Sequence, residues 1–133
     1  MTTVSRLFND QLNMNQTLGD DNMNSSDQIS FEMIAKNGAA RSLFIEAVQA
    51  AKNGNTPEAI RLMEEGEAML IEGHMIHGEL ITKYARGEGV QMDLLLVHAE
   101  DQLMAAEMFK LMAREYIEIY GRLSRLEADR HPL

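Results

Sequence analysis

The C-terminal third of the chain carries the pattern that most constrains its fold. From Asp93 to about Leu126, apolar residues recur at helical spacing in two stripes. The first stripe holds Leu94, Val97, Met104, Met108 and Leu111, with Asp101 in its middle; the second holds Leu96, Ala99, Leu103, Ala106, Ala113, Ile117 and Tyr120. A helix needs one apolar stripe to pack within its own subunit. The other stripe therefore predicts self-association through this helix.

Asp101 is an unusual residue for an apolar stripe. A lone carboxylate there costs free energy unless it is paired, protonated or bound to a metal. If three copies of the helix meet at the stripe, three Asp101 carboxylates repel one another, and a divalent cation or protonation would relieve the repulsion. Oxygen ligands favour Mg²⁺ or Ca²⁺ over softer metals. The alternatives are that Asp101 holds the ring of His98 or faces solvent.

His98 precedes Asp101 by three residues and shares its side of the helix. It can be a core histidine that hydrogen-bonds a carbonyl and does nothing else. It can also be a nucleophile, because a neutral imidazole attacks phosphorus and then passes the phosphoryl group onward. Such transfer needs positioning and charge stabilisation more than a cofactor. No Ser-His-Asp set is visible, which argues against a hydrolase.

Two earlier stretches also predict helices. The first helix is expected to start with Ser26 or Ser30 as its N-cap and to end at Asn53-Gly54, a left-handed C-cap. Asn37-Gly38 interrupts its apolar pattern. We interpret this interruption as a kink or a close helix contact, in preference to a bend that shapes a pocket.

The second helix is expected to use Thr56 as its N-cap and Pro57 as its first helical residue, and to run to about Arg86. Gly87 and Gly89 then break the pattern. The loop that follows is short, so the third helix, capped by Asp93, should return antiparallel to the second. No strand pattern is present, and the expected fold is an all-α, up-down-up bundle of three helices.

His74 and His77 lie one turn apart on the second helix, with Glu72 and Glu79 nearby. Such a group could bind a transition metal. The spacing is not the Glu-x-x-His of di-iron bundles, so ordinary histidines on a polar face are the simpler interpretation.

Composition excludes several classes of protein. The chain has 133 residues, no cysteine and a formal net charge of −9, which argue for one domain and against thiolate chemistry and nucleic-acid binding. No signal peptide or bilayer-spanning run is apparent, so we expect a cytoplasmic protein with no direct membrane insertion. We expect a flexible N-terminal arm over residues 1–25, a three-helix domain over 26–128 and a frayed C-terminus over 129–133.

Three tracts resemble one known family. Val97-His98-Ala99-Glu100-Asp101-Gln102-Leu103-Met104 is similar to the pattern V/M-H-A/G-Q-D-H-L-M of enzyme IIA of the lactose/cellobiose (N,N′-diacetylchitobiose) class of the bacterial phosphoenolpyruvate-dependent sugar phosphotransferase system. The tracts Asn37-Gly38-Ala39-Ala40-Arg41-Ser42 and Glu72-Gly73-His74 agree in order and spacing, and the resemblance covers roughly Phe31 to Leu123. Glu100, Gln102 and His77 depart from the family's usual Gln, His and Gln.

The resemblance implies an antiparallel three-helix bundle that forms a homotrimer around the third helices. His98 would accept a phosphoryl group from phospho-HPr and donate it to the cysteine of a cognate enzyme IIB, for uptake of a β-linked disaccharide. Asp101 would meet its symmetry mates around a divalent cation, usually magnesium. Glu100 would oppose an incoming phosphate if it pointed into the site. The alternative is a non-catalytic trimeric helical adaptor whose core contains a buried acid.

Overall fold

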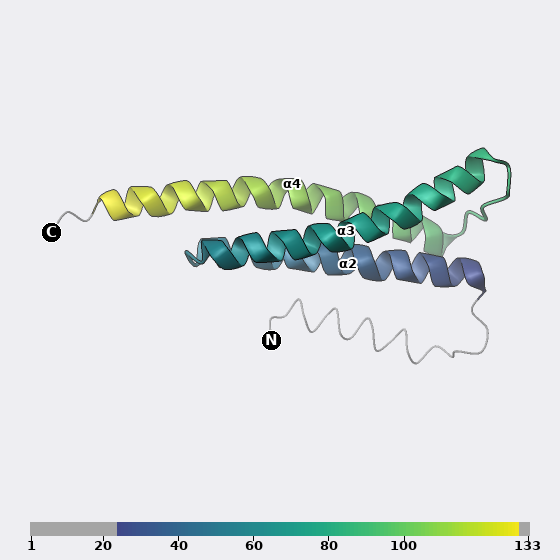
Figure 1. The fold of residues 1–133 in the computed structure, drawn as a ribbon, viewed down its shortest axis with the longest axis horizontal. Coiled ribbons are helices and arrows are strands. Elements are labelled where there is room, and N and C mark those ends of the chain that lie inside the picture. The colour runs from purple at the N-terminus through teal and green to yellow at the C-terminus, as the bar shows by residue number, and fades with distance from the viewer. Residues whose placement is uncertain (1–23, 131–133) are drawn as a thin grey trace.

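A computed structural model describes residues 24–130, which form three long helices joined by short loops (Figure 1). Helix α2 spans Ser25–Lys52, α3 spans Thr56–Ala85 and α4 spans Leu94–Asp129. The helices run up, down and up along the long axis of the molecule. The predicted all-α antiparallel bundle is therefore confirmed. The expectations for residues 1–23 and 131–133 lie outside the described residues.

Most of the predicted helix ends are confirmed by local hydrogen bonds and dihedral angles. The Asp93 carboxylate accepts the Leu96 N–H at 2.9 Å and caps α4. Asn53 is the C-cap of α2, and Gly54 follows it at φ +76°, a left-handed conformation that favours glycine. Gly87 has φ +70° and turns the chain after α3.

Two predicted N-caps are wrong by a small shift. Helix α2 begins one residue before Ser26, because the side chain of Asn24 accepts the Asp27 N–H at 2.9 Å. Thr56 is the first residue of α3 and not its cap; the cap is Asn55, whose side chain accepts the Glu58 N–H at 3.3 Å. In both helices an asparagine one or more positions upstream supplies the capping oxygen, a role that asparagine fills as well as serine or threonine.

The core lies along α2, which contacts both other helices, whereas α3 and α4 contact each other less. Its largest fully buried apolar side chains are Phe44, Met33 and Leu70. The helix runs through Asn37-Gly38 without interruption. A close helix contact is present at Asn37, one of the two interpretations of this tract, but the glycine that allows it is Gly73 of α3. Gly66 of α3 lies in the same way against the Phe44 ring. Glycine there lets α2 and α3 approach closely.

Burial on α3 stops at Gly73, and no residue from 74 to 85 is buried. Figure 1 shows the last turns of α3 leaving the side of α2 as they approach the loop to α4. In the C-terminal third of α3, Ile76 and Leu80 are only partly buried against the core, and polar contacts with α4 add to that packing. None of the helices among residues 24–130 is long and apolar enough to cross a membrane.

Candidate active site

His98 stands in the second turn of α4, close to the capped start of that helix. Its neighbours Leu96 and Ala99 are buried in the bundle, but His98 itself is exposed. Neither ring nitrogen makes a hydrogen bond to another described residue, in contrast to the rings of His74 and His77. Of the two interpretations of His98, the structure therefore supports an accessible imidazole and not a core histidine.

The two apolar stripes of α4 have different environments. The stripe that contains Leu96, Ala99 and Leu103 is buried inside the bundle. The other stripe is exposed, with Leu94 at 84% and Met104 at 66% exposure. Large exposed apolar surfaces on proteins often mark interaction sites. The stripe that the sequence assigns to packing within the subunit is thus the one that holds Leu96, Ala99 and Leu103, and the other stripe faces solvent in the single chain.

Asp101 lies on the exposed stripe, one turn beyond His98. It is exposed in the single chain and forms no ion pair with another described residue. The chain therefore presents one free carboxylate in the middle of an apolar surface. Oxygen donors of this type fit a hard divalent cation, but a single carboxylate is too few ligands, so several copies of α4 would have to share the ion.

Glu100 points away from the exposed stripe and toward α3. One of its carboxylate oxygens accepts a hydrogen bond from Nδ1 of His77 at 2.8 Å. The two side chains are 34% and 29% exposed, so the pair is half-buried. Two of the three residues that depart from the family's pattern, His77 and Glu100, thus contact each other. Because Glu100 is engaged with His77, it does not point at the His98 of its own chain.

The His77–Glu100 pair belongs to a series of polar contacts between α3 and α4. His74 bonds the carboxylate of Glu107 through Nε2 and the carbonyl oxygen of Leu70 through Nδ1, the latter at 3.0 Å. Glu67 accepts from Arg114 at 2.5 Å. The α4 partners recur every seven residues, at 100, 107 and 114. These pairs were not predicted from the sequence, although the regular seven-residue spacing of charged residues on α4 indicated one side of that helix facing a neighbour.

A transition-metal site at His74 and His77 is not supported. The two histidines bond different glutamates of α4. No group of three or more His, Cys, Asp or Glu side chains able to hold a metal occurs within one chain over residues 24–130. The neighbouring Glu72 pairs with Lys36 of α2, and that hydrogen bond raises the pKa of Lys36. These side chains therefore connect helices.

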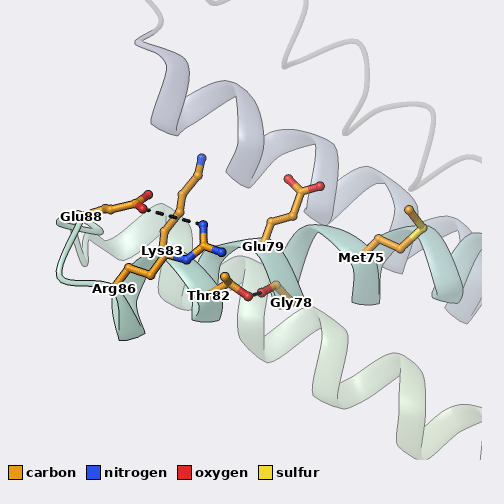
Figure 2. Close-up of a pocket in the computed structure, with 7 residues that line it drawn as sticks. All are labelled: Met75, Gly78, Glu79, Thr82, Lys83, Arg86 and Glu88. Atoms are coloured by element: carbon orange, nitrogen blue, oxygen red, sulfur yellow. Dashed lines mark hydrogen bonds and ion pairs between the residues drawn. The ribbon is translucent and has the colours of Figure 1, made fainter.

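A surface depression of about 550 Å³ lies on the C-terminal part of α3 (Figure 2). Its lining residues are Met75, Gly78, Glu79, Thr82, Lys83, Arg86 and Glu88. Arg86 and Glu88 form an ion pair at 3.9 Å, and the Thr82 hydroxyl donates to the carbonyl of Gly78 at 2.8 Å. These groups satisfy one another, and His98 is not among them. The depression is therefore not the candidate active site.

Comparison with known families decides the identity of the fold. Residues 28–121 match the model of the family described as the lactose/cellobiose-specific IIA subunit of the phosphotransferase system. The chain belongs to this family. It is 41% identical over 98 residues to the lichenan-specific phosphotransferase enzyme IIA component of Bacillus subtilis, covering 74% of this chain and 89% of that protein. It is 34% identical over 94 residues to the lactose-specific EIIA component of Staphylococcus aureus, covering 71% and 91%.

Solved structures agree with this assignment. The cellobiose-specific enzyme IIA of Bacillus anthracis superposes with a TM-score of 0.77 at 38% identity, covering 80% of this chain and 98% of that one. The IIA subunit in a solution structure of the N,N′-diacetylchitobiose IIA–HPr complex of Escherichia coli gives a TM-score of 0.67 at 28% identity, covering 77% and 99%. The resemblance seen in the sequence is therefore confirmed, and this IIA chain is a phosphotransferase-system component.

Proposed function

We propose that this IIA chain is a phosphocarrier that accepts a phosphoryl group on His98 from phospho-HPr and passes it to the cysteine of a cognate enzyme IIB. The observation that carries the proposal is an exposed imidazole, with no hydrogen bond to another described residue, on the helix that also presents Asp101. The related chitobiose protein forms a complex with HPr, which supports HPr as the donor. The transfers take place in the cytoplasm and serve uptake of a β-linked disaccharide.

The chemistry consists of two in-line transfers. The lone pair of a neutral His98 nitrogen attacks phosphorus, so a P–N bond to His98 forms as the bond to the donor breaks. In the second transfer the cysteine thiolate of IIB attacks, a P–S bond forms and the P–N bond breaks. Both transfers depend mainly on alignment of the attacking atom, the phosphorus and the leaving atom. Packing of Leu96 and Ala99 into the core fixes the turn that carries His98.

We propose further that three chains associate through the exposed stripe of α4 and that three copies of Asp101 share a divalent cation, which their oxygen ligands favour as Mg²⁺. Bound there, the ion would supply positive charge that offsets repulsion between the carboxylates. The stripe around Asp101 supports this arrangement, since Leu94, Met104 and Met108 are each more than half exposed in one chain. In such a trimer, His98 would lie beside a subunit boundary.

Phosphorylation in vitro tests the acceptor. The wild-type chain, incubated with enzyme I, HPr and phosphoenolpyruvate, should become an acid-labile phosphoprotein, and the His98→Ala variant should lose the label. His74→Ala and His77→Ala are matched controls that should still be labelled, because their ring nitrogens serve the α3–α4 contact. Equal labelling of His98→Ala and wild type would show that another residue is the acceptor and would favour the adaptor interpretation.

A further inference from the structure

The tetrapeptide Ala-Lys-Asn-Gly occurs twice in the chain, at residues 35–38 and 51–54. An asparagine followed by glycine is open to an intramolecular reaction. The backbone nitrogen of the glycine can attack the side-chain amide carbon of the asparagine, and the glycine has no side chain to hinder the approach. Because the residues beside Asn37 and Asn53 are the same, the structure around each pair decides whether it reacts.

The pair at Asn37 is enclosed by the fold. Gly38 lies near the middle of α2, where a helical N–H donates to the carbonyl oxygen four residues earlier. The Asn37 side chain is fully buried, and its amide lies against Gly73 of α3. Water does not reach this amide, and the ring that the reaction forms requires a backbone conformation outside the helical range. The pair can react only when the centre of α2 opens.

The pair at Asn53 lies in the loop between α2 and α3. Asn53 and Gly54 are both exposed, and nothing lies within 4 Å of the position that a Cβ on Gly54 would take. Three backbone hydrogen bonds hold the turn, at 3.1, 3.0 and 2.9 Å, from Asn53, Gly54 and Asn55 to the carbonyl oxygens of Gln49, Ala51 and Ala50 respectively. These bonds are at a helix end, so they can open while the packed part of α2 stays in place.

We propose that Asn53 is a site of spontaneous deamidation and that the fold protects Asn37 from the same reaction. When the turn opens, the Gly54 nitrogen gives up its proton and attacks Cγ of Asn53. A C–N bond forms, the bond from Cγ to the amide nitrogen breaks, and ammonia leaves with the proton that Gly54 lost. Water then opens the cyclic imide at one of its two carbonyls, which leaves aspartate or isoaspartate at residue 53. Water is the only co-reactant.

Deamidation changes the end of α2. Both products place a new carboxylate at the C-cap of that helix, where the partial negative charge of the last carbonyl groups disfavours an anion. Isoaspartate also adds one methylene carbon to the main chain, so the three hydrogen bonds of the turn cannot all be kept. The loop lies at the opposite end of the bundle from His98, because α2 and α4 run in the same direction (Figure 1). The proposal is therefore independent of the proposed phosphocarrier function.

Incubation of the full chain at mildly alkaline pH, followed by peptide mapping with mass spectrometry, measures both asparagines in one sample. Asn53 should convert at least about a hundredfold faster than Asn37, because a helix end opens at a much lower free energy than a helix centre. Equal rates at the two sites would overturn the proposal. So would an unchanged Asn53 after the time in which a short peptide of residues 50–57 reacts completely.

Reference measurements assign the difference between the two sites to the fold. Short peptides of residues 34–41 and 50–57 should convert at similar rates, and so should the two sites of the full chain unfolded in concentrated urea. Asn53→Gln should abolish conversion at residue 53 in the folded chain, since glutamine would have to close a larger ring. If Asn53 still reacts far faster than Asn37 in urea, the fold does not set the rates and the proposal is wrong.

Thermal unfolding tests the effect on the end of α2. Ion exchange separates the modified chain, which carries one more negative charge than the unmodified chain. The isoaspartate fraction should melt at a lower temperature than the unmodified chain. Asn53→Asp has the same added charge on an unaltered main chain and should melt between the two. An isoaspartate fraction that melts with the unmodified chain would contradict the expected loss of the turn hydrogen bonds.

Discussion

At the scale of single side chains, His77 and Glu100 depart together from the family's usual pattern, and each is the other's hydrogen-bond partner. A glutamate two positions from His98 would be a poor neighbour for a phosphoryl group if it pointed into the site. In the structure it faces the other way and accepts from His77 at 2.8 Å. The pair ties the C-terminal third of α3, which has no buried residue, to the turn of α4 that carries His98.

The coupling of His77 with Glu100 can be measured by a double-mutant cycle of alanine variants. We expect a coupling free energy of about 0.5–1.5 kcal/mol in urea unfolding, because the pair is hydrogen-bonded but screened by partial exposure. The exposed pair of Arg61 and Glu65 within α3 is the matched control and should couple more weakly. Additive effects of His77→Ala and Glu100→Ala would show that the contact does not hold α3 on α4.

At the scale of helices, the α2–α3 contact depends on two glycines one heptad apart. Gly66 faces Phe44 and Gly73 faces Asn37, which are also separated by seven residues. Asn37 is fully buried, and neither its side-chain oxygen nor its nitrogen has a conventional hydrogen-bond partner among the described residues. A Cβ at residue 73 would stand 2.0 Å from the Asn37 amide oxygen, so this buried amide fits only beside a glycine. The tracts around Asn37 and Gly73 are therefore two sides of one contact.

A methyl group at residue 73 tests this contact. Gly73→Ala should destabilise the bundle by about 1–3 kcal/mol, because its Cβ would overlap the Asn37 amide oxygen. Gly78→Ala on the same helix meets nothing within 4 Å and should stabilise it by about 0.5–1 kcal/mol. Adding Asn37→Ala to Gly73→Ala should recover part of the loss in thermal unfolding. An unchanged melting temperature for Gly73→Ala would refute the contact.

At the scale of the whole molecule, α4 packs inward on one stripe and presents the other to solvent. The exposed stripe with Asp101 and the exposed apolar residues that follow it on α4, from Met112 to Leu126, together run nearly the length of the helix. An exposed apolar surface of that extent supports the proposed association between chains. Asp101 is then the one charged group at the centre of the proposed trimer, and its role there is open to a direct test.

Replacing Asp101 separates the apolar contact from the cation. Asp101→Leu should preserve the trimer and stabilise it by on the order of 1–4 kcal/mol, because an apolar side chain replaces a costly buried acid. Metal analysis of the purified protein should show a divalent cation in the wild type and none in the variant. Monomers of Asp101→Leu in sedimentation would mean that the shared ion is needed for assembly.

The sequence alone determined the helices, because apolar spacing, capping residues and glycine breaks act within a few residues of chain. It predicted the Asp93 cap, the Gly54 turn and the two stripes of α4. It placed two caps slightly wrong, since several polar residues near a helix start can each accept the free N–H groups.

Only the tertiary structure decided which stripe of α4 faces inward, that Asn37 meets Gly73, and that Glu100 turns to His77. Each of these depends on which helix lies beside which and at what height. That relation is set by the packing of whole helices along α2, and the spacing of residues within one helix does not contain it.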